Sequence, residues 1–161
     1  MLNIALFVCN SYEENTMVIN RKDSHDAIII DPGCTEGEEL DSVVSYIEKN
    51  GLKPAAILLT HAHPDHTAGV AALQGKYGIP VYMHPLERPK DSFRSTDIED
   101  GQVLELAGIK LKVIGTPDTL PEACAIWTAR TRPCFPETRC SPGRLAGQTW
   151  KGATMTTSSF R

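Results

Sequence analysis

The chain has 161 residues, a formal net charge of -4 at pH 7 and 22% charged residues. One domain is therefore expected, and the absence of a basic block means that nucleic acid is not an expected partner. No stretch is long and apolar enough to span a membrane, and residues 1–9 lack the basic start and cleavage site of a secretion signal. We therefore expect a cytoplasmic protein without a membrane partner.

Five cysteines are scattered along the chain, an odd number without the paired spacing of a metal site. This pattern argues against a disulfide framework. Cys34 follows a turn and is assigned no role, because an ordinary small residue in a loop explains it.

Apolar runs at residues 2–8, 16–20 and 27–30 alternate with polar turns, which predicts three strands at the start of the chain. The run Ile28-Ile29-Ile30 is continuous rather than alternating, so this strand should be buried on both faces. The chain is therefore expected to open with an antiparallel sheet.

Two helices are predicted further along the chain. The first, at residues 36–49, has acidic residues at its start, Asn50-Gly51 at its end and one apolar face, made of Leu40, Val43, Val44 and Ile47. The second, at residues 67–77, is ended by Gly78.

Further strands are predicted around and after these helices. Apolar runs mark them at residues 55–59 and 79–83, and two alternating runs form a hairpin across Gly108, at residues 102–106 and 109–114. The charged stretch at residues 85–100 is expected to be a loop.

The chemically richest stretch is residues 60–66, Thr-His-Ala-His-Pro-Asp-His, directly after an apolar run. His61 and His63 are two residues apart, so an extended or turning backbone points both imidazoles to one side, where neutral ring nitrogens suit zinc or iron. Asp65 and His66 can face a second ion on a tight turn. Two ions that share a water lower its pKa, which is hydrolase chemistry. A polar surface loop is disfavoured, because three of the five histidines lie here.

This motif resembles the signature of the metallo-β-lactamase fold superfamily, His-x-His-x-Asp-His after a buried strand. The resemblance implies a mixed α/β (α+β) fold, with residues 1–117 as the amino-terminal half of an αββα sandwich. It implies that His61 and His63 bind a first metal ion and that Asp65 and His66 bind a second. Zinc is the expected metal, with iron or manganese as alternatives, and Asp65 is the expected catalytic residue because it orients the attacking water.

Other segments resemble the small glyoxalase II-like members of this superfamily: Glu14-Asn15-Thr16, Ile30-Asp31-Pro32-Gly33 and Val113-Ile114-Gly115-Thr116-Pro117. In the family the aspartate of the second segment supports the metal loop, so Asp31 is expected beside the ligands. A plain turn remains the alternative for this segment. His84 lies on a different strand from the motif and is expected to be a non-ligand.

The composition changes after Pro117. Residues 1–117 hold 30 Ile, Leu and Val residues, whereas residues 118–161 hold three. The tail has no strand or helix period, and so little aliphatic content cannot bury a second layer. We therefore expect an incomplete metallo-β-lactamase-like domain at residues 1–117 and an irregular, disordered tail at residues 118–161.

The tail also has the features of an out-of-frame reading. No histidine follows His84, although the resemblance calls for a third imidazole on the first ion and a bridging aspartate on the second. If one base was lost near codon 117, the residues from Pro117 permit Pro-Gly-His-Thr-Pro-Gly, and residues 134–141 permit Phe-Ser-Gly-Asp-Thr-Leu-Phe. We therefore predict a frameshift after Pro117, which leaves the written chain without a complete site.

By resemblance the function is that of a metal-dependent hydrolase, most similar to hydroxyacylglutathione hydrolase, in which an activated water attacks the carbonyl of a small-molecule thioester. Two alternatives stay open: an iron-dependent persulfide dioxygenase-like enzyme, and a non-catalytic metal-binding remnant whose tail binds a partner. A β-lactamase is disfavoured because no secretion signal is visible, and the sequence leaves the oligomeric state open.

Overall fold

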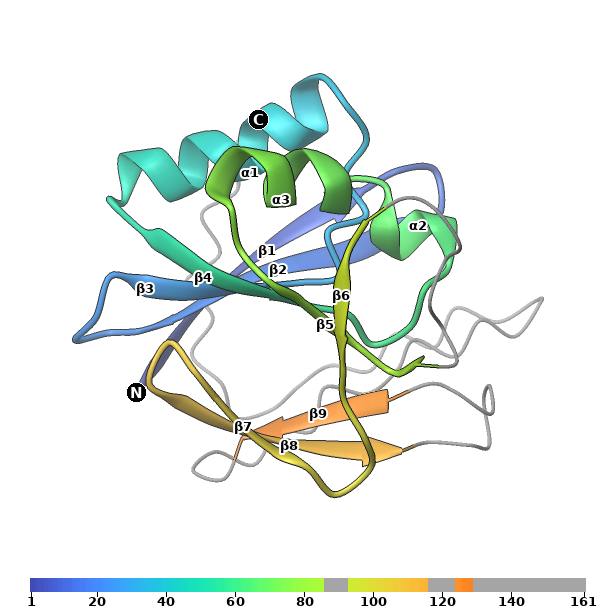
Figure 1. Ribbon diagram of the computed structural model, residues 1–161. Coiled ribbons are helices and arrows are strands. Elements are labelled where there is room, and N and C mark those ends of the chain that lie inside the picture. The colour runs from blue at the N-terminus through green and yellow to red at the C-terminus, as the bar shows by residue number, and fades with distance from the viewer. Residues whose placement is uncertain (86–92, 116–123, 129–161) are drawn as a thin grey trace.

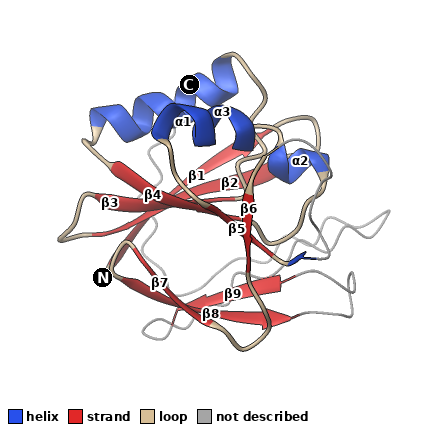
Figure 2. Ribbon diagram, viewed as in Figure 1, coloured by secondary structure: helices blue, strands red, loops and turns tan. Residues whose placement is uncertain are grey.

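The computed structural model describes residues 1–85, 93–115 and 124–128. Within these residues two β-sheets face each other, and helices α1 and α3 cover the outer face of the larger sheet (Figure 1). Figure 2 shows the same layers by type of secondary structure, with the helices on one side only. This arrangement matches the expected amino-terminal part of a metallo-β-lactamase sandwich.

The larger sheet has six strands in the order β1-β2-β3-β4-β5-β6. Its first three strands are antiparallel, as predicted, and its remaining pairs are parallel. The strands run over Leu2–Cys9, Glu14–Arg21, Asp26–Ile30, Lys53–Leu58, Val81–Met83 and Ser95–Asp97.

Strand β6 corrects the expectation of a loop at residues 85–100, of which residues 86–92 lie outside the described part. Ser95–Asp97 pairs in parallel with β5. Its sequence, Ser-Thr-Asp, has no alternation of apolar and polar residues that would indicate a strand. The strand forms because its backbone pairs with β5.

The continuous run of isoleucines in β3 is buried on both faces, as predicted. Ile28, Ile29 and Ile30 are each at most 1% exposed. Ile29 packs with the helix-side core, whereas Ile28 and Ile30 belong to the core between the two sheets. Strand β3 therefore joins both hydrophobic cores.

Helix α1 (Glu38–Lys49) forms the first predicted helix and buries Val43 and Ile47. The second helix, predicted at residues 67–77, forms as α3 (Val70–Tyr77), and a separate short helix, α2 (Pro64–Thr67), precedes it where the sequence indicates only a tight turn. The break between α2 and α3 is caused by a contact with a distant segment, because the Gly69 N–H donates to the carbonyl of Pro32 rather than to a carbonyl of its own turn. Gly78, in the left-handed conformation, ends α3 as predicted. Among the helices of the described residues, none has the length and apolar character needed to cross a membrane.

The smaller sheet has the strand order β7-β8-β9, with bounds Val103–Leu106, Ile109–Gly115 and Cys124–Thr128. The predicted hairpin across Gly108 is present, and Ala107 and Gly108 both have positive φ.

Strand β9 corrects part of the expectation of an irregular tail. Its five residues pair antiparallel with β8, which offers unpaired backbone groups along that edge. The sequence Cys-Ala-Ile-Trp-Thr also contains the β-branched and aromatic residues that favour strands. Residues 116–123 and 129–161 lie outside the described part, and so does the predicted frameshift after Pro117.

Truncation of a side chain in the shared strand should destabilise the chain strongly. We expect Ile29→Ala to lower the free energy of unfolding by about 2–5 kcal/mol, because it leaves a cavity in the helix-side core. Val8→Ala is the matched control: Val8 is 64% exposed, so its change should stay within about 0.5 kcal/mol. Urea denaturation monitored by circular dichroism measures both, and equal losses would contradict the assigned core.

Candidate metal centre

The histidine motif lies where the buried strand β4 gives way to a short helix. Thr60, His61 and His63 follow β4 in a connecting loop, and Asp65 and His66 lie in α2, which begins at Pro64. Proline at the first position suits the start of a helix. The backbone therefore turns within the motif, as its chemistry requires.

The structure brings the four predicted ligands together. The ring centroids of His61 and His66 are 4.0 Å apart, and those of His61 and His63 are 4.8 Å apart. The Nε2 atom of His66 lies 3.7 Å from Oδ2 of Asp65, a separation that two ligands of one ion can adopt. Three imidazoles and one carboxylate form a donor set that fits zinc or iron.

Asp31 fixes the start of the motif from the end of β3. Its Oδ1 accepts a hydrogen bond from the Thr60 N–H at 2.8 Å, and its Oδ2 accepts one from the Thr60 hydroxyl at 2.6 Å. Asp31 has a φ of 44°, a conformation that non-glycine residues rarely adopt and that clusters at functional sites. The carboxylate therefore lies beside the motif, where the resemblance places it.

The same hydrogen bonds determine the orientation of His61. The Thr60 hydroxyl has one hydrogen, which it donates to Asp31, so its oxygen accepts from the Nδ1 atom of His61 at 3.1 Å. This assignment puts the ring hydrogen on Nδ1 and leaves the Nε2 lone pair for a metal.

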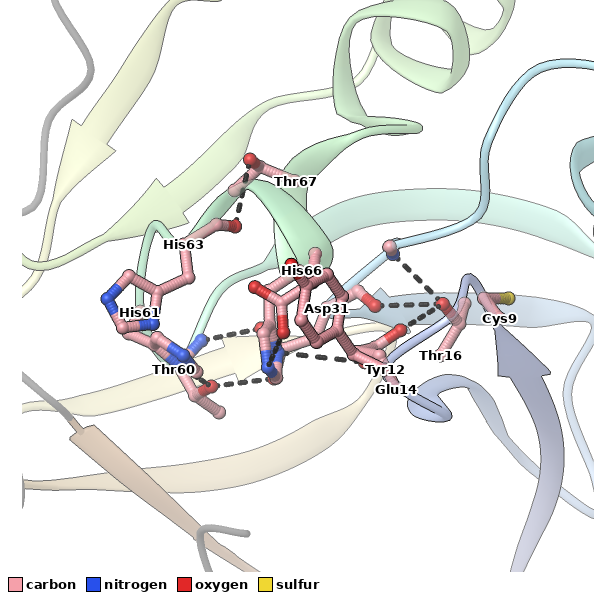
Figure 3. A network of polar contacts seen from close by, with 12 residues as sticks. Cys9, Tyr12, Glu14, Thr16, Asp31, Thr60, His61, His63, His66 and Thr67 are labelled. Atoms are coloured by element: carbon pink, nitrogen blue, oxygen red, sulfur yellow. Dashed lines mark hydrogen bonds and ion pairs between the residues drawn. The ribbon is translucent and has the colours of Figure 1, made fainter. Parts of the chain in front are cut away.

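Glu14 is a site residue that the sequence reasoning did not single out. It is 5% exposed, and with Asp31 and His66 it forms a buried group whose ligand atoms lie within 4.8 Å of one another. The Nδ1 atom of His66 lies 3.4 Å from Oδ2 of Asp31 and 3.6 Å from Oε1 of Glu14. In Figure 3, His66 and Asp31 lie in the middle, with His61 and His63 to their left and Glu14 to their right.

The environment of Glu14 favours its neutral form in the metal-free chain. Burial, with the negative charge of Asp31 adding to it, raises the pKa of Glu14 to about 9. The hydroxyl of Thr16 lies 3.0 Å from Oε2 of Glu14 and opposes part of this shift. Glu14 and Thr16 are two apart on a strand and so share a face, which is the signal that could have placed both at the site.

Asn10 and Gly33 complete the floor under α2. The Asn10 side-chain amide donates to the carbonyl oxygens of Gly33 and Asp65, at 3.1 and 2.9 Å. The Gly33 N–H donates to the Thr16 hydroxyl at 3.0 Å. A Cβ atom on Gly33 would overlap the carbonyl of Asp65, so only glycine permits this approach.

Cys34 packs beneath the break between α2 and α3. It is fully buried and lies against Gly69, where a side chain on the glycine would contact its sulfur. A hydrogen bond with Cys34 lowers the pKa of the Cys9 thiol to about 7, and the same contact together with burial raises the pKa of Cys34. These contacts are those of a packed core residue.

Two further sequence expectations concern His84 and the family-like segment at residues 113–117. His84 directly follows β5, and its non-ligand role stays a prediction. Residues 113–115 of the last family-like segment lie in β8, whereas Thr116 and Pro117 lie outside the described residues.

Sequence comparison relates this chain to a known family of proteins. A family model of the metallo-beta-lactamase superfamily matches residues 12–125. The chain is 33% identical over 115 residues to a hydroxyacylglutathione hydrolase of Klebsiella pneumoniae, a match that covers 71% of this chain and 43% of that protein. The first curated relatives are matched over 34% to 61% of their length, so the chain spans only part of them.

Solved structures agree with the fold. The crystal structure of BLEG-1 B3 metallo-beta-lactamase matches with a TM-score of 0.67 and 24% identity, over 78% of this chain and 66% of that one. The structure of TTHA1623 in a di-iron-bound form matches with a TM-score of 0.61 and 28% identity, over 76% and 66% of the two chains.

Substitution of Gly33 should disrupt the floor of the site. Gly33→Ala forces the backbone of Asp65 to move, so we expect a loss of about 1–3 kcal/mol or more in the free energy of unfolding. The control is Gly75→Ala: Gly75 lies in α3 with nothing within 4 Å of its added carbon, and alanine there should stabilise by about 0.5–1 kcal/mol. Urea denaturation measures both, and tolerance of Gly33→Ala would contradict the close approach.

The raised pKa of Glu14 predicts a pH dependence for the metal-free chain. Between about pH 4.5 and 9 the folded chain keeps a proton on Glu14 that the unfolded chain releases, so stability falls as the pH rises through this window. Glu14→Gln should remove this part of the slope, whereas Glu13→Gln, at an exposed neighbour, should keep it. Denaturation with a chelator present, repeated across this pH range, measures the slopes; identical slopes in the two variants would contradict the assignment.

Proposed function

We propose, since the chain belongs to the metallo-beta-lactamase superfamily, that its site serves metal-dependent hydrolysis of small-molecule thioesters of the hydroxyacylglutathione type. The observation that carries the proposal is the convergence of His61, His63, Asp65 and His66 on one cluster at the end of β4. The similarity to a hydroxyacylglutathione hydrolase supports the choice of substrate class.

Each ligand has a role in this proposal. His61 and His63 hold a first ion, and Asp65 and His66 hold a second. Such ions would lower the pKa of a bound water and would stabilise charge that develops on the carbonyl oxygen. The Asp65 carboxylate is partly exposed, so it can accept a hydrogen bond from the attacking water and orient it.

The metal is proposed as zinc, and iron is the second candidate. The similarity to a structure in a di-iron-bound form supports iron as an alternative metal. The iron-dependent, persulfide dioxygenase-like enzyme stays the second candidate function. Metal analysis of the purified chain together with oxygen uptake separates the two, because thioester hydrolysis consumes no oxygen.

We also propose that the residues after Pro117 are read out of frame. The fall in aliphatic content and the absence of any histidine after His84 support this. On this proposal the chain as written holds its ions weakly. A non-catalytic remnant is then the remaining alternative, and partner binding that survives His61→Ala and His63→Ala would favour it.

The proposal is tested by comparing two versions of the chain. The written chain should turn over a hydroxyacylglutathione thioester slowly or not at all, whereas a version with one base restored near codon 117 should show metal-dependent turnover. In that version Asp65→Asn should lower kcat by about 10²- to 10⁴-fold, and Asp41→Asn on the surface of α1 should leave it unchanged.

Two results would count against this reading. Fast turnover by the written chain with two bound ions would contradict the incomplete site. Absence of turnover by the restored version, loaded with zinc or with iron, would contradict thioester hydrolysis. Resequencing the source DNA across codons 112–125 tests the reading frame itself.

A further inference from the structure

Two buried polar atoms of the site face each other without a hydrogen-bond partner among the described residues. They are Oε1 of Glu14 and Nδ1 of His66, 3.6 Å apart. A buried polar group without a hydrogen-bond partner destabilises the folded chain, so a hydrogen bond between these two neighbouring atoms would be stabilising.

The other carboxylate near this imidazole is that of Asp31, whose Oδ2 lies 3.4 Å from Nδ1 of His66. A carboxylate oxygen can accept a second hydrogen bond, but those of Asp31 already hold the motif in place. Both carboxylate oxygens of Asp31 accept hydrogen bonds from Thr60. The second oxygen of Glu14, Oε2, lies at hydrogen-bond distance from the Thr16 hydroxyl. Oε1 of Glu14 therefore has its hydrogen-bonding capacity free and points at the imidazole.

We propose that Glu14 is a positioning residue for His66. One hydrogen bond between Oε1 and Nδ1 holds the imidazole so that Nε2 faces Asp65 and the other motif residues. Asp31 then positions His61 through Thr60, and Glu14 positions His66 directly. The ligand role of His66 rests on the proposed function, whereas the orientation of its ring does not.

The contacts of Glu14 suit this role. Glu14 lies in β2, His66 lies in α2, and Asp31 directly follows β3. The proposed hydrogen bond therefore joins β2 to α2, next to the end of β3. Thr16 lies two residues along the same strand face and aims the carboxyl group. A histidine that binds metal through one nitrogen is ordinarily held through the other by a carboxylate or carbonyl.

Direct binding of an ion by Glu14, Asp31 and His66 is the competing interpretation, since their ligand atoms lie within 4.8 Å of one another. The hydrogen bonds from Thr60 to Asp31 are compatible with both interpretations, because each carboxylate oxygen keeps a further lone pair. The two interpretations differ for Glu14→Gln. A carboxamide still forms the hydrogen bond to Nδ1, but it removes the charge that an ion would need.

The decisive measurement is the side-chain rotamer of His66 in the metal-free chain, from NMR couplings and ring contacts. The wild type, Glu14→Gln and the surface control Glu13→Gln should keep one rotamer. Glu14→Met, of similar length but unable to form the hydrogen bond, should show rotamer averaging or a second orientation. We expect Glu14→Met to fold, because the substitution removes a buried ionisable group. If it does not fold, Glu14→Asp takes its place, because the carboxyl group of aspartate is too short to reach Nδ1 of His66.

A folded Glu14→Met or Glu14→Asp chain that keeps the wild-type rotamer would overturn the inference, and so would a Glu14→Gln chain that loses it. Zinc titration then connects the result to the proposed function. Relative to the wild type, Glu14→Met should weaken zinc binding by about 10- to 100-fold, whereas Glu14→Gln should bind zinc about as well as the wild type. In a chain that already carries His66→Ala, adding Glu14→Met should cause no further loss of zinc binding.

The outcomes of the two measurements are separable. Failure of the wild-type chain to bind zinc counts against the proposed function and leaves the rotamer result to decide the inference. A large loss of zinc binding in Glu14→Gln with an unchanged rotamer would replace the inference with direct binding of an ion by Glu14.

Discussion

The pair of hydrogen bonds from Thr60 to Asp31 is the constraint on which the site depends. It joins the end of β3 to the first residue of the histidine motif through both a backbone and a side-chain donor. The Asp31 backbone has an unfavourable positive φ, and the contacts on both sides of it keep it there. This link places Gly33 against the carbonyl of Asp65 and Pro32 within hydrogen-bond distance of the Gly69 N–H. These contacts at Asp65 and just after α2 determine the direction of the helix.

Burial explains why the surrounding network is so complete. Glu14, Thr16, Asp31 and His66 are all buried, so water cannot replace a missing hydrogen bond. Among the fully buried side-chain polar atoms of this group, two lack a hydrogen-bond partner, and these two lie next to each other. A rigid, preorganised support of this kind is what a metal site needs, because small errors in ligand position weaken binding.

The sequence indicated those parts of the fold and site that depend on local pattern. The histidine motif could be found because its chemistry is concentrated in seven residues, and helix α1 and the buried strand β3 because their apolar residues follow a regular period. The structure also brings the four expected ligands together, although their metal role stays a prediction.

Features that depend on contacts between distant segments could not be read in this way. The break between α2 and α3 exists because the Gly69 N–H and the Asp65 carbonyl, four residues apart, do not bond to each other. The Gly69 N–H donates to the carbonyl of Pro32, and the Asp65 carbonyl accepts from the side-chain amide of Asn10. Strands β6 and β9 form by pairing with β5 and β8 rather than by their own pattern. Glu14 was part of a family-like segment, but only the fold brings it to His66. The polar contacts beneath the motif all lie within residues 10–66. During translation, the residues that make these contacts are therefore synthesised well before the ribosome reaches codon 117.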